Sequence, residues 1–151
     1  ILLKIGLIDI MHPMIKRTNK KKMIYNSPDD MYNSYRTKNI FSKISNDNLK
    51  LYINSILKDR GGKVEIKLSK NWENAIYRNG SLSDAMIWKE INKIKVTTYI
   101  ITPGNNEFGH FNYGSYLKNK NKSFINLTIN DSTHLFPIER PKEAAELILS
   151  K

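Results

Sequence analysis

The sequence predicts an α/β fold in which a parallel sheet of three strands is interrupted by a mostly helical insertion. The order along the chain is strand, several helices, strand, helix or loop, strand and helix, which suits such a sheet. Residues 1–10 form a nearly continuous apolar run, as expected of a strand buried on both faces. Residues 95–102 are rich in β-branched side chains and give the clearest strand. Residues 124–129 supply the third strand, and we expect 95–102 to lie between the other two.

The length and composition limit the classes of protein to which this chain can belong. With 151 residues, of which 40% are hydrophobic, the chain suits one domain with a substantial core. It contains no run of 18 apolar residues, so no transmembrane helix is expected. Cysteine is absent, which excludes disulfides and thiolate chemistry and, with no visible signal peptide, favours an intracellular location without fixing it.

The charge of +11 favours polyanions electrostatically. Much of it lies in the Lys-rich segments 16–22 and 118–122, which read as solvated loops. No sequence motif of DNA or RNA recognition accompanies them. A small basic binding protein that contacts nucleic acid or an anionic surface is therefore the alternative function, and not the first one.

Helices are predicted over 28–38, 48–59 and 141–149. Ser27-Pro28-Asp29-Asp30 is a strong helix start, with a capping side chain, a proline at the first position and a capping box. The apolar stripe of the second helix ends before Gly61-Gly62, which reads as its C-terminal stop. Between this glycine pair and strand 95–102 we expect a short extended piece at 63–68 and helices near 71–77 and 83–91.

Residues 132–141, Ser-Thr-His-Leu-Phe-Pro-Ile-Glu-Arg-Pro, follow the last strand and read as a turn that carries His134 before a helix opened by Pro141. Ligands of α/β sheets bind beyond the carboxyl ends of the strands. His12, Glu107 and His134 each lie just beyond such an end. An imidazole at that edge can take and return a proton, so His134 is a candidate general base.

This last strand, His-bearing turn and proline-started helix resemble the C-terminal part of the α/β-hydrolase family, in which a triad runs Ser, Asp or Glu, then His along the chain. The resemblance implies that His134 is the catalytic base. Glu107 stands at the fourth position of Gly104-Asn105-Asn106-Glu107, where the family commonly has the acid as Asp. Asp9, near the end of the first strand, is the alternative acid, although the expected acidic-Pro pair is Met11-His12-Pro13 here.

The family's nucleophile motif, Gly-x-Ser-x-Gly, occurs nowhere among the seven glycines of this sequence. The chain also begins within an apolar run at Ile1. We therefore expect the C-terminal fragment of a serine hydrolase, inactive alone, whose nucleophile would come from an upstream segment. The resemblance implies hydrolysis of a small-molecule ester or lipid-like substrate without metal or organic cofactor.

Residues 16–92 resemble the cap region of that family, inserted into a partial hydrolase domain that spans 1–151. The segments Tyr25–Tyr32, 48–59, 64–68 and 73–77 look like the branch of peroxisomal lipase-like and toxin-biosynthesis-like proteins. The cap would shape a substrate pocket, for which Tyr32, Tyr35, Phe41 and Trp72 are candidates, although such aromatic residues are more often simply core.

Overall fold

The structure, a computed structural model, describes residues 12–105 and 112–151, with the side chains of 81–86 excepted. The chain divides into two compact units. The first unit contains the residues up to Tyr35 together with Ile53–Lys89, and the second unit contains Arg36–Tyr52 together with Glu90–Lys151. The segment 1–10, predicted as the first strand, lies outside the described residues.

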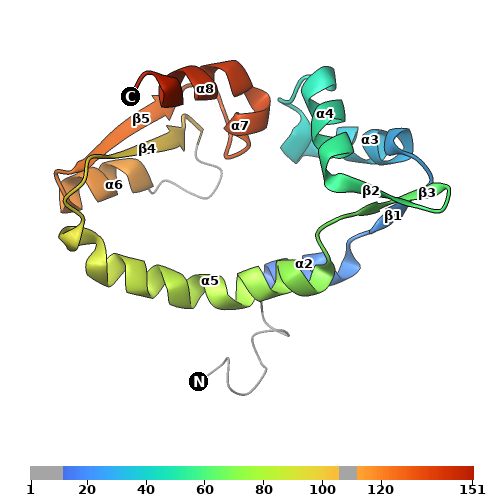
Figure 1. The fold of residues 1–151 in the computed structure, drawn as a ribbon, viewed down its shortest axis with the longest axis horizontal. Helices are drawn as coiled ribbons and strands as arrows, with labels where there is room; N and C mark the ends of the chain where they lie inside the picture. Colours follow the sequence, from blue (N-terminus) through green and yellow to red (C-terminus); the bar gives the residue numbers. More distant parts are fainter. Residues whose placement is uncertain (1–11, 106–111) are drawn as a thin grey trace. The chain divides into compact units, whose positions relative to one another are not determined.

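The first unit combines helices with a small antiparallel sheet (Figure 1). Its elements are α2 (Pro13–Lys20), β1 (Ile24–Tyr25), α3 (Pro28–Arg36), β2 (Leu57–Arg60), β3 (Lys63–Ile66) and α5 (Lys70–Glu90). Helix α4 (Asn46–Ile56) contributes its beginning to the second unit and its end to the first. Among the described residues of the first unit, the buried hydrophobic side chains are Ile15, Tyr25, Met31, Tyr35, Ile53, Leu57 and Ile66.

The Lys-rich segment 16–22 is not the predicted loop, because most of it belongs to α2. The Nδ1 atom of His12 caps this helix by accepting a hydrogen bond from the backbone N–H of Met14 at 3.3 Å. Ile15 is fully buried on one side of the helix, while the cations of α2 are exposed. The cap and the buried side chains of Ile15 and Thr18 therefore anchor a strongly charged stretch as a helix.

Helix α3 begins as the sequence predicts. The backbone N–H of Asp30 donates to the Ser27 hydroxyl at 3.1 Å, and the Asp30 carboxylate accepts from the backbone N–H of Asn26 at 3.0 Å. This second bond is the main reason that the pKa of Asp30 lies below its usual value. The first bond satisfies an N–H of the first helical turn, and the second ties the residue before the cap to that turn.

The predicted helix 48–59 is wrong at its C-terminal end. Helix α4 stops at Ile56, and the next four residues form β2, which pairs antiparallel with β3. The short strand β1 pairs with the other edge of β3. Gly61 and Gly62 do not cap a helix but form the turn of this hairpin, with φ angles of 57° and 82°. Both residues need the left-handed region, which matches the strand twist and which only glycine enters at no cost.

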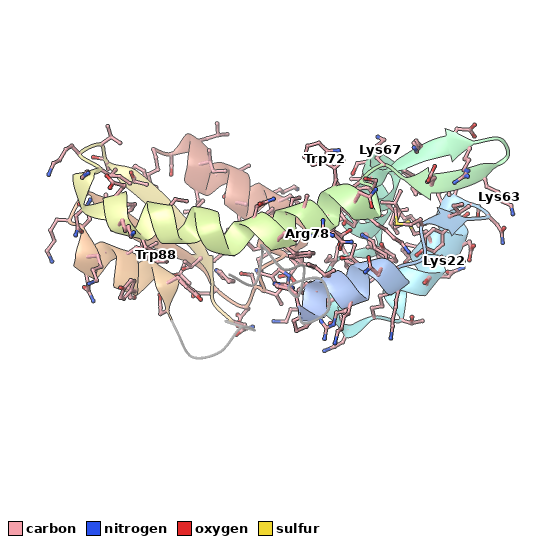
Figure 2. The ribbon with its side chains drawn as sticks, turned by 90° about the horizontal axis from the view of Figure 1, so that it is seen from below. Lys22, Lys63, Lys67, Trp72, Arg78 and Trp88 are labelled. Atoms are coloured by element: carbon pink, nitrogen blue, oxygen red, sulfur yellow. The ribbon has the colours of Figure 1, made fainter. Side chains whose placement is uncertain are left out.

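One continuous helix, α5, replaces the two helices predicted near 71–77 and 83–91. The side of α5 that contacts α2 is polar: the Glu73 carboxylate accepts from Lys21 Nζ at 2.8 Å and from Thr18 Oγ1 at 3.2 Å. Trp72 and Ile76, four residues apart on α5, are exposed, and so is Leu68, which precedes the helix. Figure 2 shows Trp72 pointing away from the helix axis. Within the described ranges, none of the helices combines the length and hydropathy needed to span a membrane.

The second unit is built on two parallel strands. Its elements, besides the first part of α4, are η1 (Asn39–Phe41), η2 (Ile91–Lys93), β4 (Thr98–Pro103), α6 (Tyr113–Lys120), β5 (Phe124–Ile129), α7 (Phe136–Glu139) and α8 (Pro141–Leu149). Strands β4 and β5 pair in parallel from Thr98↔Phe124 to Pro103↔Ile129. The predicted strands 95–102 and 124–129 and the helix 141–149 are therefore present, and the pairing of the two strands is as predicted.

Helix α6 connects the two strands and packs closely against β5, and Figure 1 shows it along one side of the strand pair with α8 along the other. Gly114 permits this approach, because a Cβ atom there would lie 2.1 Å from Asn126 Oδ1. That same oxygen accepts a hydrogen bond from Thr102 Oγ1 at 3.1 Å, which links the two strands through their side chains. The strand–helix–strand order and the parallel register define an α/β unit.

Alanine at two glycines should have opposite effects on stability. Gly62→Ala places a Cβ in the left-handed region and should lower the free energy of unfolding by about 1–2 kcal/mol. Gly80→Ala lies inside α5, where a new Cβ meets no atom within 4 Å, and should raise it by roughly 1 kcal/mol. Urea unfolding followed by circular dichroism measures both. A neutral Gly62→Ala variant would contradict the hairpin turn.

Candidate active site

The loops that follow β4 and β5 are joined at the carboxyl edge of the strand pair. The backbone N–H of Gly104 donates to the Ile129 carbonyl at 2.8 Å, and that of Asn105 donates to the Ser132 carbonyl at 3.0 Å. The first bond belongs to the parallel ladder, which ends at Pro103↔Ile129, and the second bond joins the two loops just beyond it. As a result, the start of the loop that carries Glu107 lies directly beside the loop that carries His134.

Gly104 makes this contact possible. A Cβ atom on Gly104 would lie 2.9 Å from Asn130 Cα, 3.0 Å from Asp131 N and 3.1 Å from the Ile129 carbonyl oxygen. These neighbours are backbone atoms, which cannot rotate aside as a side chain can. The sequence motif Gly-x-x-Glu therefore has a physical basis at its first position, because the residue there must lack a side chain.

The turn after β5 is held by its own side chains. Asp131 has a φ of 52°, which reverses the chain just beyond the strand. Ser132 is fully buried, and its hydroxyl donates to the Ile129 carbonyl at 2.7 Å. The Ser132 hydroxyl thus bonds back to the end of β5, which fixes the backbone from which the next residues continue.

His134 follows this turn and is half-buried. The residue before it, Thr133, is only 6% exposed, and its hydroxyl accepts a hydrogen bond from the backbone N–H of Leu135 at 3.1 Å. The sequence predicted a simple turn between His134 and Pro141, but residues 136–139 form the short helix α7 there. His134 thus lies between a buried, bonded residue and the start of a helix.

Two residues from the middle of the predicted insertion also contact this loop. Lys43 Nζ donates to the Asp131 carbonyl at 3.3 Å, and Asn48 Nδ2 donates to the Ile138 carbonyl at 2.9 Å. They lie about 90 residues from their partners in the sequence, and no local pattern in the chain signals them. Sequence reasoning therefore missed both.

A recess of about 360 Å³ borders the His-bearing loop. Its lining includes two cations and two carboxylates: Lys43, Arg140, Asp131 and Glu139. Because these charges balance, the recess does not select an anion by net charge alone. Its polar lining, however, places four hydrogen-bonding groups beside the loop of the candidate base.

The two candidate acids, Glu107 and Asp9, fall outside the described residues, as does His110. Among the described residues, the structure brings the loop that carries His134 beside Gly104 and Asn105, at the start of the Glu107 loop. His12, which the sequence placed beyond a strand end, caps α2 and stacks on Tyr77 with ring centroids 5.7 Å apart. Across the described part of the chain, His, Asp and Glu side chains do not gather into a group of three that could hold a metal ion.

No protein-family model matches this sequence, and a search of curated proteins finds no match. Solved structures do match. The peroxisomal α/β-hydrolase Lpx1 from Saccharomyces cerevisiae matches 84% of this chain with a TM-score of 0.68 and 15% sequence identity. E-2-(acetamidomethylene)succinate hydrolase matches 97% of it with a TM-score of 0.72 and 10% identity. A thioesterase domain from the curacin biosynthetic pathway matches 98% of it with a TM-score of 0.68 and 12% identity.

The fold and the strand-end loops thus define an α/β protein with its candidate site at the carboxyl edge of parallel strands. The structural matches make the fold specific: it is the α/β-hydrolase fold. The chain spans 34%, 52% and 50% of the lengths of these three solved structures.

The contact at Gly104 can be tested directly. Gly104→Ala should force the two loops apart, lower the free energy of unfolding by about 1–3 kcal/mol and speed amide exchange at Asn105. Hydrogen exchange followed by NMR measures the second effect. Gly80→Ala is the matched control, since it adds the same methyl group in open space. Unchanged protection of the Asn105 amide in Gly104→Ala would contradict the joined loops.

Proposed function

We propose that this chain is the C-terminal portion of a serine α/β-hydrolase that cleaves a small-molecule carboxylic ester or a related lipid-like acyl compound. The observation that carries the proposal is the bond between Asn105 N–H and the Ser132 carbonyl. It sets the beginning of an acid-bearing loop beside the loop of a half-buried histidine, at the edge where ligands of α/β sheets bind. The solved structures of similar fold, described as hydrolases and a thioesterase, support acyl-transfer chemistry.

In the proposed mechanism, His134 takes the proton of a serine hydroxyl as that oxygen attacks the acyl carbon. The same imidazole then returns the proton to the leaving alcohol. A carboxylate that accepts the other ring N–H would fix the tautomer and stabilise the imidazolium. The serine and the backbone donors of the oxyanion hole would come from a segment outside these 151 residues, because the sequence contains no Gly-x-Ser-x-Gly.

Glu107 is the proposed acid, and Asp9 is the alternative. Asn105 is bonded to Ser132 at 3.0 Å, and Glu107 follows Asn105 by two residues, just as His134 follows Ser132 by two. Two residues extend the chain by at most about 7 Å. The tether is thus short enough for the Glu107 carboxylate to reach the imidazole across the joined loops.

Segment 16–92 is proposed as the cap of this hydrolase. The described part of it contains helices α2, α3, α4 and α5 and the three-stranded antiparallel sheet. The candidate pocket residues differ in exposure, because Tyr35 is buried while Trp72 is 69% exposed. Tyr35 therefore belongs to the core, whereas Trp72 is exposed and stays a candidate pocket residue of the proposed cap.

Activity should depend on the upstream nucleophile. The 151-residue chain alone should neither hydrolyse p-nitrophenyl esters above buffer nor react with a fluorophosphonate probe. A longer polypeptide that carries Gly-x-Ser-x-Gly upstream should do both, and His134→Ala should abolish both. His12→Ala is the control, because His12 caps a helix in the other unit. Probe labelling of the 151-residue chain itself would overturn the proposed site.

The choice of acid can be tested in the same longer polypeptide. Glu107→Gln should lower kcat by roughly 10³–10⁴-fold, because the imidazole loses the partner that fixes its tautomer. Asp9→Asn should leave kcat within about threefold of the unsubstituted protein. Steady-state ester hydrolysis measures both variants. The reverse pattern would transfer the role of acid to Asp9.

A further inference from the structure

Glu139, at the end of α7, binds the residue that precedes His134 through both carboxylate oxygens. Its Oε2 accepts from the backbone N–H of Thr133 at 2.8 Å, and its Oε1 accepts from the Thr133 hydroxyl at 2.5 Å. Hydrogen bonds to a charged acceptor are shorter and stronger than those between neutral groups. Thr133 is thereby fixed at its backbone and at its side chain by one group.

The same contact reaches the residue on the other side of His134. The Thr133 hydroxyl, while donating to Glu139, accepts from the backbone N–H of Leu135 at 3.1 Å. A hydroxyl that donates its only proton to a carboxylate presents its lone pairs elsewhere, and here it presents one to Leu135. A single carboxylate therefore orders both neighbours of the candidate base.

Glu139 is itself held in place, so the arrangement forms a closed ring. Its backbone N–H donates to the Leu135 carbonyl at 3.0 Å, and that of Phe136 donates to the Thr133 carbonyl at 3.0 Å. The ring runs from Thr133 through His134 and α7 to Glu139 and back. The triad motif does not include a carboxylate at position 139, and its spacing from His134 in the sequence does not call for one.

We propose that Glu139 is a positioning residue for His134. It fixes the backbone on both sides of the imidazole, so that the ring is presented in one orientation and not in several. The catalytic importance of this orientation rests on the proposed function, whereas the hydrogen bonds that link Thr133, Leu135 and Glu139 are independent of it. Glu139 acts through Thr133 and takes no proton from a substrate. Preorganisation of this kind matters because a misplaced base loses most of its effect.

The first experiment uses the 151-residue chain labelled with nitrogen-15. Glu139→Ala should speed amide exchange at Thr133 and Leu135 by at least about tenfold and should replace the defined His134 side-chain couplings with rotamer-averaged values. Glu139→Gln, which keeps one acceptor oxygen, should give an intermediate effect and serves if the alanine variant fails to fold. Unchanged amides in β4 and β5 show that the strand pair is intact.

Two further variants separate the contribution of the Thr133 hydroxyl from that of its backbone N–H. Thr133→Val removes the hydroxyl but keeps the N–H bond to Glu139, so Leu135 should lose protection while residue 133 keeps it. Thr133→Ser restores the hydroxyl and should restore the protection of Leu135. Glu143→Gln is the matched control, since Glu143 forms an exposed ion pair with Arg140 at 3.6 Å and is not part of the hydrogen bonds around Thr133. An equal effect of Glu143→Gln, or defined His134 couplings in Glu139→Ala, would overturn the positioning role.

The second experiment measures ester hydrolysis by the longer polypeptide with the upstream nucleophile. Glu139→Gln should lower kcat by at least about tenfold with little change in KM, and Glu143→Gln should change neither. A loss confined to KM would overturn the positioning of the base. If the unsubstituted protein shows neither turnover nor probe labelling, the proposed function fails, while the exchange data still decide whether Glu139 orders the residues around His134.

Discussion

The contact on which the candidate site depends is the close approach of two backbones at the carboxyl ends of β4 and β5. The parallel register brings Pro103 opposite Ile129, the Gly104 N–H completes this ladder, and the Asn105 N–H joins the two loops beyond it. Because Gly104 has no side chain, the second loop can pass over it at van der Waals distance. The turn at Asp131 and the placement of His134 both depend on this contact between the two loops.

Beyond that contact, polar groups hold the His-bearing loop, although such loops usually lie on the surface and move more than the strands they follow. Ser132 returns a hydrogen bond to the end of β5, Glu139 binds Thr133, and Asn48 binds Ile138. Each bond offsets the cost of burying a polar group, and together they leave the loop few alternative conformations. The same network explains how a buried threonine can precede the candidate base.

The first unit shows how strand pairing can replace a predicted helix end where two glycines permit a tight turn. The sequence 57–66 contains a helix-compatible start, yet Gly61 and Gly62 both adopt positive φ angles and turn the chain back on itself. The three-stranded sheet that results buries Leu57 and Ile66. Its basic side chains are partly paired, since Lys58 and Arg60 both contact Glu65, at 3.3 and 3.2 Å. Such exposed pairs contribute little to stability.

The sequence by itself determined the strand pair, the helix starts at Pro28 and Pro141 and the position of His134 beyond a strand, because periodicity, caps and β-branched runs act over a few residues. It did not determine the hairpin at Gly61-Gly62 or the helix around Ile15, since strand pairing and burial decide these. Lys43, Asn48 and the role of Glu139 were also beyond its reach. Their partners are set by how distant segments fold together, and only the tertiary structure brings those atoms within hydrogen-bonding distance.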